Sequence, residues 1–253
     1  MENKPNEENL HTYDNGFHPK EVVLKPDYKF YRKDKWFKFK RKLTIIFSRF
    51  YLFFPKHLKW NFKIVGRENI KNAQGTLIVC NHVHQFDVIY ILASKLGKKC
   101  YATVLQSNLG FGLVSKYFVS GGAVPIPEDP KLFRTFSKET INTLKQNYSV
   151  IVCAEAALVP FCDHVRPFLP GAFHFAYQAG VKITPVLTTF HKPKGIYRIL
   201  RGNKPCLKLN ILPQYEIKDL GNKKLSIDTA CNELHEIMSN YFNEHSDYFK
   251  NSN

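Results

Sequence analysis

The stretch TLIVCNHVHQFDVIYILA, residues 76–93, places two histidines and an aspartate between two apolar segments. Residues 76–80 form a short apolar run typical of a buried strand, and residues 87–97 have the spacing of a helix that ends at Gly97. His82 follows the predicted strand almost at once. Ligands of open α/β sheets bind at the carboxyl ends of the strands. The position of His82 therefore makes it a candidate for catalysis or binding.

Strand-like and helix-like segments alternate along most of the chain. This alternation predicts an α/β fold with a mostly parallel or mixed central sheet flanked by helices. We expect strands at residues 61–69, 76–80, 100–106, 123–127, 149–155, 182–190, 206–213 and 215–218. We expect helices at residues 87–97, 171–180 and 131–147, a short one within 108–122, and a closing one at 227–249.

Length and composition predict one enzyme-sized domain with a terminal appendage. The chain has 253 residues, of which 44% are hydrophobic, enough to fill a core. Its six cysteines form no C-x-x-C pair, which favours reduced thiols of a cytosolic protein over disulfides or a zinc site. Residues 1–26 are polar, lack the apolar core of a signal peptide, and are expected to be poorly ordered. No apolar run reaches the roughly 18 residues of a membrane-spanning helix.

Residues 27–59 form a basic, aromatic arm, and residues 60–253 the predicted main domain. The chain has a formal net charge of +16. Between Tyr31 and Lys59 it has ten Lys or Arg residues and a single acidic residue, Asp34. Apolar side chains recur in the arm at helical spacing: Trp36, Phe39, Leu43, Ile46, Phe47, Phe50 and Phe54. Such a helix can lie in the interface of an anionic membrane. The alternative is a helix packed on the domain with a solvated basic edge. Residues 43–54 are too apolar for a nucleic-acid arm, and no nucleic-acid partner is expected.

His82 and Asp87 can meet if the chain turns after the strand and the helix begins near Asp87. A carboxylate on one imidazole nitrogen fixes the tautomer and leaves the other nitrogen as a general base for a hydroxyl. A structural histidine beside a helix-capping aspartate explains the same residues, and the residues alone do not decide. His84 has no equally clear partner and is expected to support the site or lie on the surface.

A metal site is the other interpretation of His-x-His followed by a carboxylate. In zinc hydrolases with the pattern H-x-H-x-D-H, the aspartate lies four residues after the first histidine. Here Phe86 occupies that position. We therefore expect no metal.

Residues 81–87, NHVHQFD, resemble the N-H-x4-D block of the glycerolipid acyltransferases, the 1-acylglycerol-3-phosphate (lysophospholipid) acyltransferase family. Asn81, His82 and Asp87 match that block. Three further blocks of the family follow in order, and the resemblance covers about residues 60 to 190. They are GGAVPIPE (121–128), CAEAALVP (153–160) and ITPVLT (183–188).

The second and third blocks depart from the family pattern. Gly122 and Ile126 match the second block, but Glu128 stands where many members have arginine. Of the third block, usually E-G-T-R, only Glu155 is kept, and Leu158 replaces the arginine. Those arginines are thought to hold the phosphate of the acceptor. The identity of the acceptor therefore stays open.

Two other arginines lie near these blocks. Residues 164–171, HVRPFLPG, are similar to an element of a bacterial subgroup with degenerate second and third blocks, and keep Arg166 and Pro167 of it. Arg166 and Arg134 are candidates to bind phosphate, because arginine offers a bidentate fork. The alternatives are a solvated helix residue for Arg134, a surface ion-pair partner for Arg166, and an ordinary edge carboxylate for Glu155.

The resemblance implies an acyltransferase in which His82 accepts the proton of an acceptor hydroxyl that attacks an acyl thioester. Asp87 then orients the imidazole. The implied donor is acyl-CoA or acyl carrier protein, the acceptor a lysophospholipid or related glycerolipid, and no cofactor is needed. The implied substrate-binding residues are Asn81, Gly122, Ile126, Arg134, Glu155 and Arg166.

The same resemblance, with the basic arm, predicts a cytoplasmic protein bound peripherally to the inner face of an anionic membrane. Two alternatives stay open. One is a catalytically impaired lipid-binding or scaffold protein on the same fold, because EAAL replaces most of the third block. The other is acyl transfer to an acceptor without phosphate, such as a glycolipid.

Overall fold

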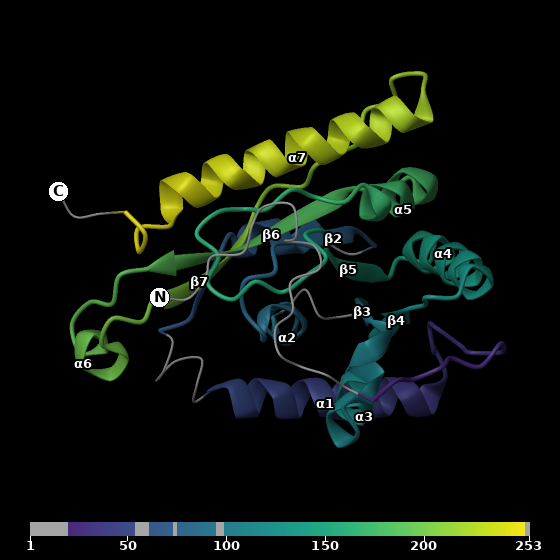
Figure 1. Ribbon diagram of the computed structural model, residues 1–253, viewed down its shortest axis with the longest axis horizontal. Coiled ribbons are helices and arrows are strands. Elements are labelled where there is room, and N and C mark those ends of the chain that lie inside the picture. The colour runs from purple at the N-terminus through teal and green to yellow at the C-terminus, as the bar shows by residue number, and fades with distance from the viewer. Residues whose placement is uncertain (1–19, 54–60, 73–74, 95–98, 251–253) are drawn as a thin grey trace.

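A seven-stranded sheet forms the centre of the protein. The computed structural model describes residues 20–53, 61–72, 75–94 and 99–250 (Figure 1). The strand order is β1-β7-β6-β2-β5-β3-β4. All neighbouring strands are parallel except β6 and β7, which confirms the predicted mixed, mostly parallel sheet. The strands are β1 (Lys63–Val65), β2 (Leu77–Cys80), β3 (Cys100–Leu105), β4 (Ala123–Ile126), β5 (Ser149–Cys153), β6 (Ile183–His191) and β7 (Cys206–Ile211).

The central strands are buried on both faces, which is why their sequences read as continuous apolar runs. Every residue of β2 is buried. Cys80, the last residue of β2, pairs with Cys153 of β5 on one side and with Val186 of β6 on the other. The chain therefore leaves β2 between two neighbouring strands, at the carboxyl edge of the sheet.

Helices cover both sides of the sheet. They are α1 (Lys35–Phe53), α2 (Asp87–Ala93), α3 (Leu113–Gly121), α4 (Pro130–Lys145), α5 (Gly171–Ala179), α6 (Tyr197–Arg201) and α7 (Lys223–His245). In Figure 1, α7 lies on one side of the sheet, and α1, α2 and α6 lie on the other. The long helix α7 packs an apolar stripe against the sheet, with Leu234, Met238 and Phe242 at most 1% exposed.

Two predicted strands differ from the structure. Residues 215–218 form no strand, and Tyr215 makes only an isolated antiparallel bridge with Ile183. The predicted strand at residues 61–69 shrinks to the three residues of β1, because the chain turns at Gly66 with φ +76°. A Cβ at Gly66 would lie 2.0 Å from the carbonyl oxygen of Ile211, so this turn requires glycine.

The helices differ from prediction at several ends and at α6. Helix α2 ends at Ala93 and α7 at His245, each four residues before its predicted end. Helix α7 begins at Lys223, four residues before the predicted start at 227, because the side chain of Asn222 accepts a hydrogen bond from the N–H of Leu225 and caps it. The five-residue helix α6 was not predicted, since its segment has neither the length nor the periodicity of a typical helix.

Helix α1 packs on the domain through a narrow, largely polar stripe. Phe37, Arg41 and Ser48 are buried, and the Arg41 guanidinium donates to the carbonyl oxygens of Gly121 and Cys100. The apolar side chains of the arm point away from the domain and are 50–81% exposed: Trp36, Phe39, Leu43, Ile46, Phe47 and Phe50. The described part of the domain thus leaves most of the apolar face of α1 exposed, with Phe47 touching Tyr117 of α3 at one edge. No helix among the described residues is long and apolar enough to cross a membrane.

Part of the segment predicted to be a poorly ordered tail packs on the domain. Residues 1–19 lie outside the described part of the chain, as do residues 54–60 at the end of the arm. Leu24, however, is 7% exposed, and the carbonyl oxygen of Val22 accepts a hydrogen bond from Gln106. Phe30 and Tyr31 are buried in the main core. The boundary predicted at residue 26 therefore does not separate a loose tail from the folded chain.

Candidate active site

His82 lies on the loop that joins β2 to α2, at the carboxyl edge of the sheet. Its Nδ1 atom is 3.6 Å from Oδ2 of Asp87, the first residue of α2. This is close enough for an ion pair and longer than a hydrogen bond. The side chain of His82 is 21% exposed, whereas that of Asp87 is 1% exposed. The structure thus brings the two predicted residues together, with the histidine partly exposed and the carboxylate buried beside it.

Three hydrogen bonds fix the Asp87 carboxylate. Its Oδ2 atom accepts from the N–H groups of Val83, at 2.9 Å, and His84, at 2.7 Å. Its Oδ1 atom accepts from the hydroxyl of Thr188 on β6, at 2.8 Å. The N-cap of α2 is Phe86, without a side-chain hydrogen bond, so Asp87 is not the helix cap of the structural alternative. Thr188 is a site residue that the sequence did not single out.

The surroundings of His82 favour its protonated form. Burial lowers the pKa of His82, but the neighbouring Cys153 and the Asp87 carboxylate more than offset this, so the pKa lies above its ordinary value. Cys153 itself lies 3.4 Å, sulfur to sulfur, from Cys80. All six cysteines are free thiols in the structure. With Nδ1 toward Asp87, the Nε2 atom of His82 is left for a substrate.

Glu155 and Arg166 form a buried ion pair behind the same loop. Oε2 of Glu155 lies 2.7 Å from Nη2 of Arg166, and both side chains are 0% exposed. The Glu155 carboxylate also accepts from the N–H groups of His82, at 2.9 Å, and Arg166, at 3.0 Å. Burial raises the pKa of Glu155, and Arg166 together with these backbone donors opposes the rise.

Arg166 ties the loop that follows Glu155 to the His82 loop. Its guanidinium donates to the carbonyl oxygens of Ala157 and, at 3.4 Å, of His82. The expectation of a surface ion pair for Arg166 is therefore wrong, because the pair is enclosed by the protein. A role of Arg166 in holding an acceptor phosphate stays a prediction, and the contacts show a side chain that holds the loop.

Asn81 is likewise part of the framework. Its amide donates to the carbonyl oxygen of Thr188 at 3.1 Å and accepts from the N–H of Thr188 at 2.9 Å, and the residue is fully buried. These two bonds lock the end of β2 to β6, and they bring Thr188 beside Asp87.

His84 is also buried, at 4% exposure, rather than on the surface. Its Nδ1 accepts from the N–H of Phe86, which requires a neutral ring there, and burial lowers the pKa of His84.

The other predicted binding residues lie away from the His82 loop. Gly122, with φ +104°, ends α3 at a point where a Cβ would lie 3.0 Å from Nε of Arg41. Ile126 is the last residue of β4, an edge strand of the sheet. Neither these residues nor Arg134 belongs to the loops around His82. Their binding roles stay predictions.

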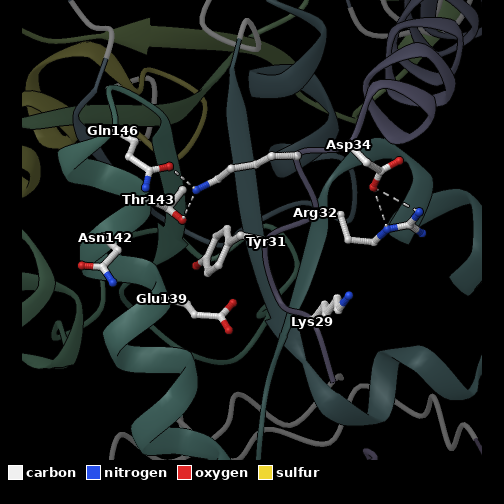
Figure 2. Close-up of a pocket in the computed structure, with 9 residues that line it drawn as sticks. Lys29, Tyr31, Arg32, Asp34, Glu139, Asn142, Thr143 and Gln146 are labelled. Atoms are coloured by element: carbon white, nitrogen blue, oxygen red, sulfur yellow. Dashed lines mark hydrogen bonds and ion pairs between the residues drawn. The ribbon is translucent and has the colours of Figure 1, made fainter. Parts of the chain in front are cut away.

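Arg134 lies on the exposed side of α4, in a hollow lined also by Thr135, Lys138, Glu139 and Asn142. A neighbouring cavity of about 850 Å³ lies between α4 and residues 29–34 (Figure 2). In that cavity Lys33 donates to Thr143 and Gln146, and Arg32 pairs with Asp34. Neither hollow is lined by His82 or Asp87.

One group in the described part of the chain could hold a metal ion. Cys162, Asp163 and His164 are consecutive on the loop after Glu155, and their ligand atoms lie within 4.8 Å of one another. Asp163 and His164 are exposed and pair with each other at 2.8 Å. The group contains neither His82 nor Asp87.

Comparison with known proteins places this geometry in a family. A family model described as acyltransferase matches residues 61–189, slightly more than half of the chain. The chain belongs to the acyltransferase family. The match includes the His82 loop, Glu155, Arg166 and Thr188, so the residues of this acyltransferase that form the site all lie inside it.

Two relatives of this acyltransferase are fungal. An uncharacterized acyltransferase of Schizosaccharomyces pombe is 25% identical over an alignment of 205 residues that covers 76% of this chain and 69% of that protein. A 1-acyl-sn-glycerol-3-phosphate acyltransferase of Saccharomyces cerevisiae is 25% identical over 177 residues, 64% of this chain. The chain spans 54% of the length of that relative.

A solved structure shares the fold. The crystal structure of PlsC, a 1-acyl-sn-glycerophosphate acyltransferase from Thermotoga maritima, matches with a TM-score of 0.58 and 18% sequence identity. The match covers 85% of this chain and 84% of that one. The likeness confirms the predicted α/β architecture.

Proposed function

We propose that this acyltransferase moves a fatty acyl group from acyl-CoA or acyl carrier protein to a hydroxyl of a lysophospholipid of the 1-acylglycerol-3-phosphate type. The observation that carries the proposal is the pair of His82 and Asp87. The histidine is 21% exposed, and the carboxylate behind it is fixed by three hydrogen bonds. The name of the yeast relative supports the choice of acceptor.

In the proposed reaction, Nε2 of His82 takes the proton of the acceptor hydroxyl as its oxygen attacks the thioester carbonyl. Asp87 holds the ring and stabilises the imidazolium that forms. The tetrahedral intermediate collapses, the carbon–sulfur bond breaks, and the imidazolium returns its proton to the departing thiolate. General base catalysis of this kind contributes about a hundred- to ten-thousand-fold in rate.

The test is release of free thiol from acyl-CoA and from acyl carrier protein, with and without added lysophosphatidate. Release should depend on the lysolipid, and His82→Ala should lose it by about a hundred- to ten-thousand-fold. His245→Ala, which changes an exposed histidine at the end of α7, is the control and should keep full activity. A folded His82→Ala protein with near-normal turnover would overturn the mechanism. Lipid binding without any thiol release would favour the scaffold alternative.

A second acceptor class has its own support. The two arginines expected to hold a phosphate are not both open to a substrate at His82. Arg166 contacts the His82 carbonyl oxygen but is enclosed in its pair with Glu155, and Arg134 lines a hollow on α4 that does not include His82. Acyl transfer to an acceptor without phosphate, such as a glycolipid, fits this arrangement. Turnover with lysophosphatidate and with an uncharged monoacylglycerol distinguishes the two. A strong preference for the uncharged acceptor would replace the phosphate assignment.

The proposal includes attachment to the inner, anionic face of a membrane through α1. Six apolar side chains of α1 that are at least half exposed, interleaved with lysines and arginines, support it. Point changes test this better than deletion of the arm, because Phe30, Tyr31 and Phe37 are part of the core. Trp36→Ser with Phe50→Ser should weaken binding to vesicles that contain phosphatidylglycerol by roughly tenfold or more. Unchanged binding would contradict attachment through α1.

A further inference from the structure

The segment from Lys192 to Lys204, which includes α6, presents a second apolar and basic surface. Ile196, Ile199 and Leu200 are 66%, 86% and 54% exposed. They are spaced i, i+3 and i+4, so they share one side of the helical turn. Exposed branched aliphatic side chains gathered in one place mark a contact site more often than scattered ones do.

The charge of this segment has one sign. Lys192, Lys194, Arg198, Arg201 and Lys204 lie within it, and the sequence has no Asp or Glu between Asp163 and Glu216. Lys194, Arg198 and Lys204 are exposed beside the apolar side chains. Arg201 is buried and donates to the carbonyl oxygen of Pro205, which anchors the segment from within. The exposed surface therefore combines aliphatic tips with cations, which is complementary to an anionic lipid surface.

The segment lies at the same end of the sheet as the candidate site. It follows β6, which runs five residues beyond Val186, the partner of Cys80 at the end of β2. Arg201 acts electrostatically on His84 and on Tyr90, two residues of the His82 loop and of α2. In Figure 1, α6 and α1 also lie on the same side of the sheet, opposite α7.

We propose that residues 192–204 are a second membrane-binding element, which inserts Ile196, Ile199 and Leu200 into an anionic bilayer at the edge of the active site. This inference rests on the proposed membrane-bound acyl transfer and adds the surface that faces the lipid at the site. Helix α1 attaches the protein, and the α6 segment brings the carboxyl edge of the sheet to the bilayer, from which a lysolipid acceptor can enter.

The test is sedimentation of the full-length protein with vesicles of phosphatidylcholine containing about 30% phosphatidylglycerol, a range in which charge attraction is strong. The variant is Ile199→Ser with Leu200→Ser. The matched control is Leu225→Ser with Ile237→Ser, which changes two apolar residues of α7 that are 53% and 46% exposed. The α6 variant should lose about tenfold in vesicle partitioning. The α7 variant should partition like the unchanged protein.

Equal partitioning of the α6 and α7 variants would overturn the inference. Lys194→Gln with Arg198→Gln keeps the apolar tips and should lower binding only at low salt, because surface attraction is screened. If the Ile199→Ser, Leu200→Ser variant loses vesicle binding at all salt concentrations because it is unfolded, circular dichroism will show this. The folded charge variant, Lys194→Gln with Arg198→Gln, then decides whether the α6 surface binds the vesicles. A concentration-dependent dimer that the α6 changes abolish would assign the surface to a second copy of the chain and overturn the lipid assignment.

These outcomes separate the inference from the proposed function. If the protein binds vesicles through both elements but releases no thiol from any acyl donor, the α6 surface stands and acyl transfer fails. If thiol release depends on lysolipid while only the α1 variant affects partitioning, the proposed function stands and the α6 surface fails.

Discussion

Asp87 and Glu155 are buried carboxylates that hold the same loop, and they differ in what balances their charge. Asp87 accepts from the N–H groups of Val83 and His84 and faces the ring of His82 at 3.6 Å. Glu155 accepts from the N–H of His82 and pairs with a guanidinium that is 0% exposed. The counter-charge of Asp87 is thus a ring that gains and loses a proton, whereas that of Glu155 is permanent. Two buried carboxylates beside one loop can therefore serve different ends: we propose that Asp87 acts on the base His82, whereas Glu155 holds the loop through its bonds to His82 and Arg166.

The largest expected effect is on the activity of Asp87→Asn. The amide oxygen can still accept from the two backbone N–H groups, and the NH₂ group can donate to the Thr188 hydroxyl, so the fold should lose at most about 1 kcal/mol. The amide carries no charge, however, so it cannot stabilise the imidazolium that forms when His82 takes the proton. Turnover should fall by roughly a hundred- to ten-thousand-fold, the range that general base catalysis contributes. Steady-state thiol release measures the loss of turnover, and circular dichroism checks that the variant is folded. Near-normal turnover would remove the distinction between the two carboxylates.

The second prediction concerns the stability of the Glu155 pair. Glu155→Ala leaves the Arg166 guanidinium buried without its carboxylate, which typically costs about 3–5 kcal/mol in the free energy of unfolding. Urea denaturation measures this change. Glu155→Met combined with Arg166→Leu removes both charges and should recover most of the loss. If the single variant is as stable as the unchanged protein, Glu155 does not hold the loop.

A smaller effect is expected at Thr188. Thr188→Val keeps the volume of the side chain and removes the hydroxyl that donates to Asp87, a bond to a charged group worth about 1.5–3 kcal/mol. We expect kcat to fall by about tenfold. Thr189→Val is the control, because Thr189 bonds Asn210 and His191 instead. Equal losses of kcat in the two variants would mean that the Asp87 bond has no special role.

The smallest predicted effect is a shift of the pH profile. A general base must be neutral, so kcat/KM should rise with pH through the pKa of His82. Because Cys153 and Asp87 hold that pKa above its ordinary value, the midpoint should lie above about 6.5. In Asp87→Asn the midpoint should move to lower pH, since the carboxylate no longer favours the imidazolium. A profile with its midpoint below 6 in the unchanged protein would contradict this.

The sheet could be predicted because its central strands are apolar without interruption. Residues 76–80, 149–155 and 182–190 had the composition of strands buried on both faces, and all three are strands of the structure. The prediction of a strand at residues 215–218 is wrong. A short alternating segment does not reveal whether a neighbouring strand is present to pair with it. Helix α6 was missed because five residues are too few to show a helical period.

The site was predicted only where its residues are close in sequence. His82 and Asp87 lie five residues apart, directly after a predicted strand, and this position predicted that they form a site. Thr188 is 101 residues from Asp87, and only the pairing of β2 with β6 brings them together. Arg166 looks like a surface residue in the sequence, and its complete burial follows from the fold of the loop around Glu155.

The exposed face of α1 shows a similar limit. The sequence predicted the helical spacing of its aromatic residues, but it did not predict which side of the helix contacts the domain. The structure buries Phe37, Arg41 and Ser48 instead. Periodicity predicts that a helix has an apolar face, and the contacts of the folded chain decide whether that face is covered.

The measurement that tests the difference between the two carboxylates most directly is an NMR titration of the His82 imidazole in three proteins. These are the unchanged chain, Asp87→Asn and Glu155→Gln. The pKa of His82 should fall by about 1 to 3 in Asp87→Asn, because an opposite charge close to the ring is removed. It should change little in Glu155→Gln, whose charge is balanced by Arg166. The same pKa for His82 with and without the Asp87 carboxylate would contradict the account.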